Sequence, residues 1–180
     1  MNTLIVYESM FGNTRRIGEA IADALRAAGA SVTVTTAAKA PVDLTGYDRV
    51  VIGAPTHAHS LPQPSSRKDA ATWAEEGRKE LTLEPGAADE SGVREWLQRV
   101  ALAESTARFA SFSTRADFPL IFAGDAAAAI KRRLRKRGVT VDAHEDFRVD
   151  FDSHLLDGEA QRAGEWATTL IPVAAGRDRD

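Results

Sequence analysis

The sequence predicts an α/β protein built on a doubly wound, five-stranded parallel sheet with the strand order 2-1-3-4-5. Short apolar, β-prone runs alternate with segments whose apolar residues recur at helical spacing. Most connections between them are short enough for right-handed crossovers. One connection, residues 55–106, is longer than a helix with two short loops requires. We therefore expect a helical insertion between the third and fourth strands.

The first third of the chain predicts three strands and one helix. Residues 4–7 are apolar and β-prone, and from Ile17 onward apolar residues recur every three or four positions, as in an amphipathic helix. Gly29 is a typical residue to end that helix. Residues 31–35 alternate as a half-exposed strand does, whereas residues 49–53 form the continuous apolar run of a central parallel strand.

The last part of the chain predicts two further strands and two further helices. We expect the fourth strand at residues 107–112 and the next helix at residues 126–137. The fifth strand is expected at residues 139–141 or at residues 147–149. The last helix is expected from about residue 159 to residue 171.

The long connection predicts two helices of its own. One helical stretch, at about residues 69–81, contains Trp73, and a second helix contains Trp96 and Leu97. The second is expected to be the ordinary crossover, with those two side chains on the core side. The first is then an insertion, about residues 60–90, beside the ligand edge of the sheet. It would cover a site, bind a partner, support a dimer or lie in solvent as a decoration.

Length and composition indicate one globular domain. The 180 residues are 43% hydrophobic and 27% charged, which suits a single domain over residues 1–175 with a polar tail at residues 176–180. A formal charge of −3 gives no general attraction to nucleic acid or membranes, so we expect neither partner. The absence of cysteine excludes disulfides and thiol catalysis. With no signal-peptide pattern at the start, we expect a cytoplasmic location.

A run of basic residues lies near the end of the helix predicted at residues 126–137. Six of the seven residues 131–137 are Lys or Arg, and Ile130 and Leu134 keep one face of the helix apolar. Cations are favourable at the negative end of a helix dipole. The sequence therefore favours a solvated helix end over a nucleic-acid site.

The junction between the first strand and the first helix carries most of the functional information. In such a turn, free backbone N–H groups converge at the positive end of the helix dipole, where hydroxyls add donors to a bound phosphate. A single glycine and no lysine exclude the dinucleotide and nucleoside-triphosphate fingerprints. The sequence favours a terminal phosphate monoester; the alternative is that two hydroxyls merely cap the helix. We call this segment loop 1; it consists of Ser9, Met10, Phe11, Gly12, Asn13 and Thr14.

Two cations follow loop 1 directly. Arg15 and Arg16 lie in the first turn of the helix, where the dipole disfavours positive charge unless an anion is bound nearby. Their position is a further indication of a phosphate.

Two more polar segments follow the third and fourth strands, at the same edge of the sheet. Because ligands of doubly wound sheets bind at the carboxyl ends of the strands, we expect all three segments to form one crevice. His57 and His59 have the i, i+2 spacing of two metal ligands, but no third ligand lies nearby in the sequence. The other alternative is that both histidines are solvent-exposed loop residues. Loop 2 consists of Pro55, Thr56, His57, Ala58 and His59, and loop 3 of Ser113, Thr114 and Arg115.

Four motifs together resemble flavodoxin-family proteins of the actinobacterial type. They are Y-E-S-M-F-G-N-T-R at residues 7–15, G-A-P-T-H-A-H at 53–59, F-S-T-R at 112–115 and D-G-E-x-x-R-A-x-x-W at 157–166. The resemblance implies a flavodoxin-like fold, FMN as cofactor, and electron transfer or quinone and flavin reduction. It assigns loop 1 to the FMN phosphate, loop 2 to the flavin ring and loop 3 to the far side of the ring.

The chain also departs from electron-carrying flavodoxins. These usually place a Trp and a Tyr against the flavin ring, where this chain has histidines, Ser113 and Thr114, and they have two small hydroxyl residues where it has Met10 and Phe11. We expect an imidazole near the ring to make the midpoint potential of a bound flavin depend on pH between about pH 5 and 8.

Three functions stay open from the sequence. The first is FMN-dependent electron transfer or redox catalysis with a redox partner protein or a small-molecule acceptor. The second is a flavodoxin-fold binding module with weak or no FMN, acting through the insertion. The third is an NAD(P)H-dependent quinone reductase that holds FMN between two subunits of a homodimer.

Overall fold

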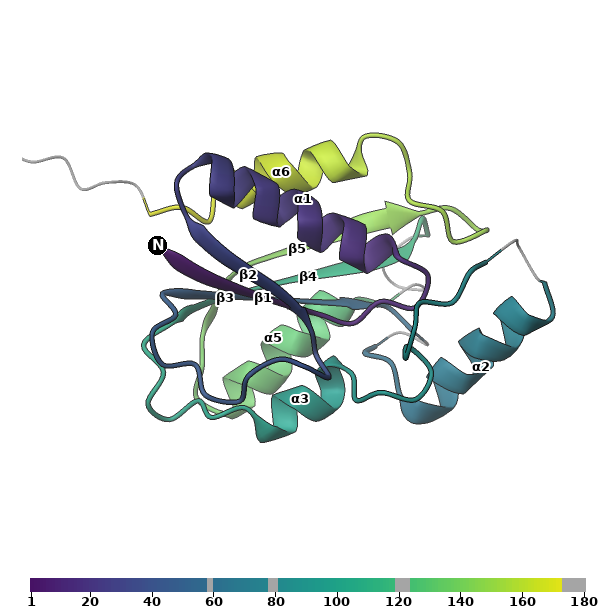
Figure 1. Cartoon of the computed structure of the whole chain (residues 1–180), viewed down its shortest axis with the longest axis horizontal. Coiled ribbons are helices and arrows are strands. Elements are labelled where there is room, and N and C mark those ends of the chain that lie inside the picture. Colours follow the sequence, from purple (N-terminus) through teal and green to yellow (C-terminus); the bar gives the residue numbers. More distant parts are fainter. Residues whose placement is uncertain (58–59, 78–80, 119–123, 173–180) are drawn as a thin grey trace, which may run out of the picture.

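The computed structural model of the chain describes residues 1–57, 60–77, 81–118 and 124–172. Its five strands form one parallel sheet in the order β2-β1-β3-β4-β5 (Figure 1). The fold class and the strand order predicted from the sequence are both confirmed. The strands are β1 (Asn2–Tyr7), β2 (Ser31–Thr36), β3 (Arg49–Pro55), β4 (Arg108–Ala116) and β5 (Val141–Val149).

Helices cover both faces of the sheet. Helices α1 (Asn13–Ala27) and α6 (Glu159–Thr168) lie on one face, and α3 (Val93–Arg99) and α5 (Ala126–Lys136) lie on the other (Figure 1). Helix α2 (Pro64–Glu75), from the insertion, lies beyond the carboxyl ends of the strands. None of the described helices is both long and apolar enough to cross a membrane.

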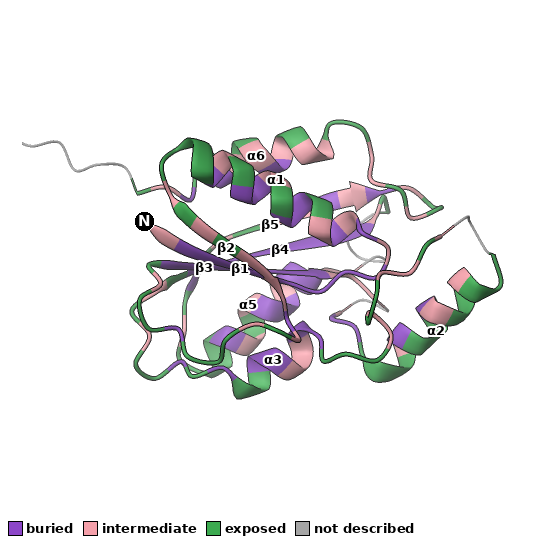
Figure 2. Ribbon diagram, in the orientation of Figure 1, coloured by how far each residue is buried: buried purple, intermediate pink, exposed green. Residues whose placement is uncertain are grey.

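The alternation of side chains along β1 divides the core in two. Leu4 and Val6 belong to the apolar cluster beneath α3 and α5, whereas Ile5 and Tyr7 belong to the cluster beneath α1 and α6. The inner strands β1, β3 and β4 are accordingly the most continuously buried elements in Figure 2, whereas the edge strands β2 and β5 are partly exposed. Trp96 and Leu97 of α3 are buried in the first cluster, as predicted.

One glycine is fixed by close packing inside this core. A Cβ atom on Gly53 would lie 2.0 Å from the ring of Phe112 in the neighbouring strand. The ring therefore occupies the space of the missing side chain. Gly53 and Phe112 are direct partners in the pairing of β3 with β4, so only glycine fits at this position of β3.

The fourth strand is longer than predicted. Loop 3 belongs to the end of β4, not to a loop: Thr114 pairs with Pro55 of β3, and Arg115 pairs with Arg148 of β5. The polar side chains are tolerated there because they have partners. The hydroxyl of Ser113 donates to Asp125, and Arg115 forms an ion pair with Asp146, at 2.9 and 2.8 Å.

Three other boundaries also differ. β5 spans residues 141–149 without interruption, because it pairs with β4 past a bulge between Phe109 and Ala110. α6 ends at Thr168, three residues before the predicted end. The insertion helix begins at Pro64, where a missing N–H costs nothing, and ends at Glu75 before Gly77, whose φ is 65°. Residues 78–80 of its predicted range lie outside the described residues.

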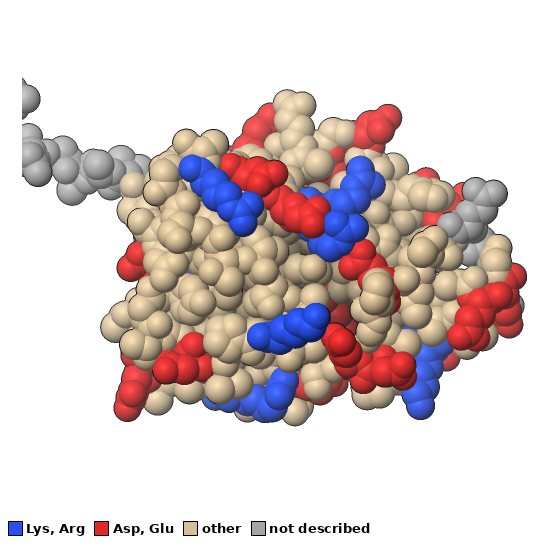
Figure 3. All heavy atoms as spheres, viewed as in Figure 1, with Lys and Arg blue, Asp and Glu red and all other residues tan. Residues whose placement is uncertain are grey.

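The basic run ends α5 as predicted. Lys136 is the last residue of the helix, and the guanidinium of Arg137 donates to the carbonyl oxygens of Leu97 and Val100 at 2.6 and 2.9 Å. Part of the run thus satisfies the C-terminal carbonyls of α3. On the face shown in Figure 3, basic and acidic side chains are interspersed.

Candidate functional site

A cavity of about 400 Å³ lies at the carboxyl edge of the sheet. Its walls come from loop 1, the ends of β3 and β4, the residues after β5, and one face of α2. This volume lies within the range of about 300–1,000 Å³ that is typical of small-molecule sites. The three polar segments expected to form one crevice therefore do so.

Most of the predicted site residues line this cavity. Gly12 lies outside it and lines a neighbouring cavity, while Ser113 is fully buried with its hydroxyl turned to Asp125. Ala58 and His59 lie outside the described residues. The predicted residues that line the cavity are Ser9, Met10, Phe11, Asn13, Thr14, Pro55, Thr56, His57, Thr114 and Arg115.

Loop 1 presents the start of α1 to the cavity. Gly12 precedes the helix with φ at 87°, and its N–H donates to the Ser9 hydroxyl oxygen at 3.1 Å. The first helical bond runs from the N–H of Arg16 to the carbonyl of Gly12, so the N–H groups of Asn13, Thr14 and Arg15 have no acceptor within the helix. No side chain caps the helix, and its first turn has no acidic residue. The loop thus keeps helix donors available for an anion.

The hydroxyls of Ser9 and Thr14 and the side-chain amide of Asn13 all have partners within the protein. Thr14 is almost completely buried, and its hydroxyl lies 2.8 Å from that of Thr114 on β4. Asn13 donates to the carbonyl of Ser153 at 2.5 Å. These bonds join loop 1 to β4 and to the segment after β5. Neither hydroxyl caps α1, so the simple capping alternative is not what the structure shows.

Arg15 is not evidence for a bound phosphate. Its guanidinium binds Glu84 at 2.8 Å and Glu19 at 2.9 Å, so two carboxylates already compensate its charge. The backbone N–H of Glu84 also donates to the carbonyl of Met10 at 2.8 Å. A Cβ on Gly12 would lie 3.3 Å from a carboxylate oxygen of Glu84. Loop 1 therefore has a carboxylate beside it, neutralised by Arg15.

His57 lies in the cavity wall at the end of β3. Its Nδ1 is 3.2 Å from the hydroxyl of Ser66 on α2, and its backbone exchanges two hydrogen bonds with Ser60. Burial, together with the positive charge of Arg67, lowers the pKa of His57 to about 4. The imidazole is thus largely neutral between pH 5 and 8. The proton coupling expected for a bound flavin in that range stays a prediction.

Arg115 lines the cavity but is bound by the protein. It is 2% exposed, its Nε donates to Asp146 at 2.8 Å, and its guanidinium also donates to the carbonyl of Phe118 at 2.7 Å. Its charge is therefore balanced by Asp146. It holds the segment that follows β4 rather than offering a free cation to a ligand.

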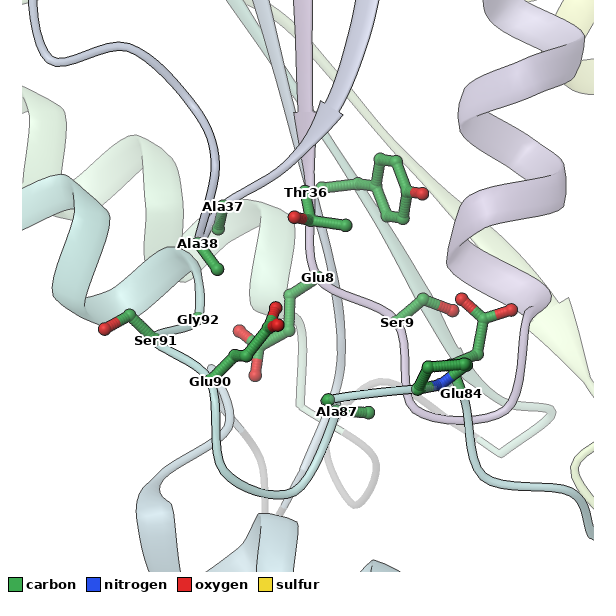
Figure 4. A pocket seen from close by; sticks show the side chains of 13 residues that line it. Glu8, Ser9, Thr36, Ala37, Ala38, Glu84, Ala87, Glu90, Ser91 and Gly92 are labelled. Carbon is green, nitrogen blue, oxygen red and sulfur yellow. The ribbon is translucent and has the colours of Figure 1, made fainter.

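A buried ion pair attaches the insertion to the start of loop 1. Nε of Arg67 on α2 lies 2.8 Å from Glu8, whose other carboxylate oxygen accepts the N–H of Val93 at 2.9 Å. Arg67 also binds Glu95. Burial raises the pKa of Glu8, while Arg67 and the Val93 N–H oppose this rise. Figure 4 shows Glu8 at the end of β1 directed toward Gly92, where an added Cβ would meet its carboxylate at 2.3 Å.

Several cavity residues were not predicted. Ser66, Asp69, Ala70 and Trp73 line it from α2, and their spacing of three and four residues is the signal of one helix face. The sequence contained this spacing, but not the orientation of α2. Phe118 and Phe151, which follow β4 and β5, had no local signal at all. The remaining unpredicted residues are Ala116, Val149, Asp150 and Ser153.

Comparison with known proteins agrees with this arrangement. Residues 4–81 match the protein family described as Flavodoxin domain, and the matched range includes the whole of loops 1 and 2. Solved structures match over nearly the whole chain. An archaeal flavodoxin is 18% identical, with a TM-score of 0.58, and covers 94% of this chain and 96% of its own. The fold is that of the flavodoxins.

Two further flavodoxins show the same architecture. Flavodoxin 1 of Bacillus cereus is 18% identical, with a TM-score of 0.60, over 93% of this chain and 95% of its own. The flavodoxin of Streptococcus pneumoniae TIGR4 is 19% identical, with a TM-score of 0.63, over 94% of this chain and 97% of its own. No curated protein sequence matches the chain.

Proposed function

We propose that the chain is a flavodoxin-family protein that binds FMN in this cavity and takes part in electron transfer or flavin-dependent redox chemistry. The observation that carries the proposal is the cavity itself. It joins the donor groups at the start of α1 to the ends of β3 and β4, at the ligand edge of a doubly wound sheet. The family match over residues 4–81 supports the same conclusion.

The residues present suit the two ends of FMN. The phosphate end would meet the N–H groups of Asn13 and Thr14 and the hydroxyls of Ser9 and Thr14. Each of these hydroxyls can accept one bond within the protein and still has its own proton to donate. The ring end would lie against the carboxyl ends of β3 and β4, where Pro55, His57 and Thr114 line the cavity. Bound FMN would supply the redox chemistry, and the protein would orient it, exclude water from it and tune its potential.

The finer parts of the proposal come from the sequence. We infer no nucleic-acid or membrane partner, because the net charge is only −3. We infer a cytoplasmic setting from the absence of a signal-peptide pattern. A redox partner protein or a small-molecule acceptor follows from the resemblance to flavodoxins. The actinobacterial type rests on the four sequence motifs. Ser113 would support the ring side indirectly, through Asp125 at the start of α5.

The proposal is tested by adding FMN to the purified protein and following the flavin absorbance and emission. Saturable binding at one FMN per chain is the expected result, and no binding up to millimolar FMN would favour the binding-module alternative. Oxidation of NADPH with a quinone by the FMN-bearing protein, together with a dimeric mass in solution, would instead favour the quinone reductase.

A further inference from the structure

Helix α2 turns one face toward the cavity. Ser66, Asp69, Ala70 and Trp73 line the cavity, and they follow one another at the spacing of a single helix face. The insertion is therefore a wall of the site and not a solvated decoration. Figure 1 places α2 beyond the strand ends, on the opposite side of the sheet from α1.

Aromatic side chains are exposed in one place only within the described residues. The large hydrophobic side chains exposed there are Val42, Trp73, Phe118 and Phe151, and the three aromatic ones all line this cavity. Burying such rings elsewhere would have stabilised the fold by about 1.5–3 kcal/mol each. Their shared position at one cavity is typical of a ligand site.

Among the three exposed aromatic residues of the cavity, Trp73 is the one whose ring does not pack against another described ring. It is 47% exposed and, within the part of the chain that the structure describes, has no ring contact. Phe118 and Phe151 already pack edge to face, with ring centroids 4.6 Å apart. The other two tryptophans pack within the fold: Trp96 is fully buried, and Trp166 packs against Phe147.

The position of Trp73 is fixed by its helix. Only two residues of α2 are buried, Arg67 and Ala70, and Arg67 is bound by the carboxylates of Glu8 and Glu95. This pairing ties α2 to the residue that immediately precedes loop 1. The wall that carries Trp73 and the loop assigned to the phosphate are thus held together.

We propose that Trp73 stacks on the isoalloxazine ring of the bound flavin, in place of the aromatic residues that loops 2 and 3 lack. This inference rests on the proposed function. The flavin ring would then contact a residue of the insertion, which lies more than ten positions after the end of loop 2, where the sequence predicted the ring contact. The Phe118–Phe151 pair supplies further apolar surface to the same cavity.

The experiment compares FMN and riboflavin, which share the ring but not the phosphate. Trp73→Ala should weaken both ligands by the same factor, about 2–13-fold for one lost stacking contact. Trp73→Phe should restore most of the affinity. Trp166→Phe, which removes a tryptophan outside the cavity, is the matched control and should change neither affinity.

A second measurement reads the contact directly. An indole stacked on a flavin quenches flavin emission by electron donation, so bound flavin should be markedly more emissive in Trp73→Phe than in the parent or in Trp166→Phe. Unchanged affinity and emission in both Trp73 variants, with FMN still bound by the parent, would overturn this inference and leave the proposed function standing. Failure of the parent to bind either ligand would overturn both.

Discussion

The ion pair between Arg67 and Glu8 gives the most quantitative prediction for this fold. Arg67 is 3% exposed and Glu8 is 7% exposed, with Nε and Oε1 2.8 Å apart. Arg67→Met keeps the apolar stem but removes the charge, so the carboxylate of Glu8 stays buried with the Val93 N–H as its remaining partner. Leaving one buried charge unpaired costs about 3–5 kcal/mol. That is a large share of a typical free energy of unfolding, about 5–15 kcal/mol.

Removing both charges should cost less than removing one. In the double variant Glu8→Gln with Arg67→Met, the amide oxygen of the new side chain still accepts from Val93, and no buried charge is left unpaired by the change. We expect the double variant to recover at least about 2 kcal/mol relative to Arg67→Met alone. Arg15→Met is the control, because Arg15 also binds two carboxylates but is 39% exposed, and it should cost less than about 1 kcal/mol.

The assay is urea unfolding followed by circular dichroism. The dependence of the unfolding free energy on urea concentration is compared between variants, to check that the transition is unchanged.

The loss of stability caused by Arg67→Met should become smaller as the pH is lowered. Burial raises the pKa of Glu8 in the folded state above its ordinary value of 4.5, and loss of Arg67 raises it further. A carboxyl group whose pKa is higher in the folded than in the unfolded state makes the fold less stable as the pH rises through the folded pKa. The stability lost in Arg67→Met is therefore greatest at neutral pH and smallest near pH 4.5. A cost below 1 kcal/mol at pH 7, or no recovery in the double variant, would refute this reasoning.

Three further predictions concern the site. Thr14→Val should weaken FMN by about 10-fold or more, the loss of one hydrogen bond to a charged group, and leave riboflavin within about twofold. Thr114→Val, which removes the partner of that hydroxyl from the cavity wall, is the control and should affect FMN and riboflavin alike. Equal losses for FMN and riboflavin in Thr14→Val, measured by fluorescence titration, would show that the loop does not hold the phosphate. His57 has a folded pKa of about 4, against an ordinary value of 6.5. Because the unfolded chain binds this proton first, stability should fall as pH drops from 6.5 toward 4, by about 1–2 kcal/mol at pH 5. His57→Gln should remove that part of the pH dependence of urea unfolding, and parallel curves for parent and variant would contradict it. Glu84→Gln removes the carboxylate beside loop 1 and leaves Arg15 with Glu19 as its one remaining carboxylate partner, so FMN should bind a few-fold tighter relative to riboflavin at low salt. The gain should disappear at about 1 M salt, where the Debye length falls to about 3 Å.

The sequence predicted the sheet because its signals are local. Apolar runs and helical periodicity state which face of each segment is buried, and the short connections leave few topologies. Boundaries were less accurate where pairing decides them. Ser113 and Arg115 were placed in a loop because they are polar, yet both lie in β4, where Asp125 and Asp146 provide partners for their polar groups. Those partners come from elements that follow later in the chain, so no sequence pattern within residues 113–115 indicates them.

The sequence by itself determined the location of the site. Loop 1 is a continuous motif, and the carboxyl ends of parallel strands must meet at one edge of the sheet, so loops 1 and 2 converge whatever the side-chain packing. Only the tertiary structure decided what encloses the site. Arg67 and Glu8 are separated by 59 positions, and Trp73 reaches the cavity from a helix that this ion pair attaches to the end of β1. A periodic pattern states which face of a helix is apolar, but the partner of a buried charge is set by three-dimensional packing.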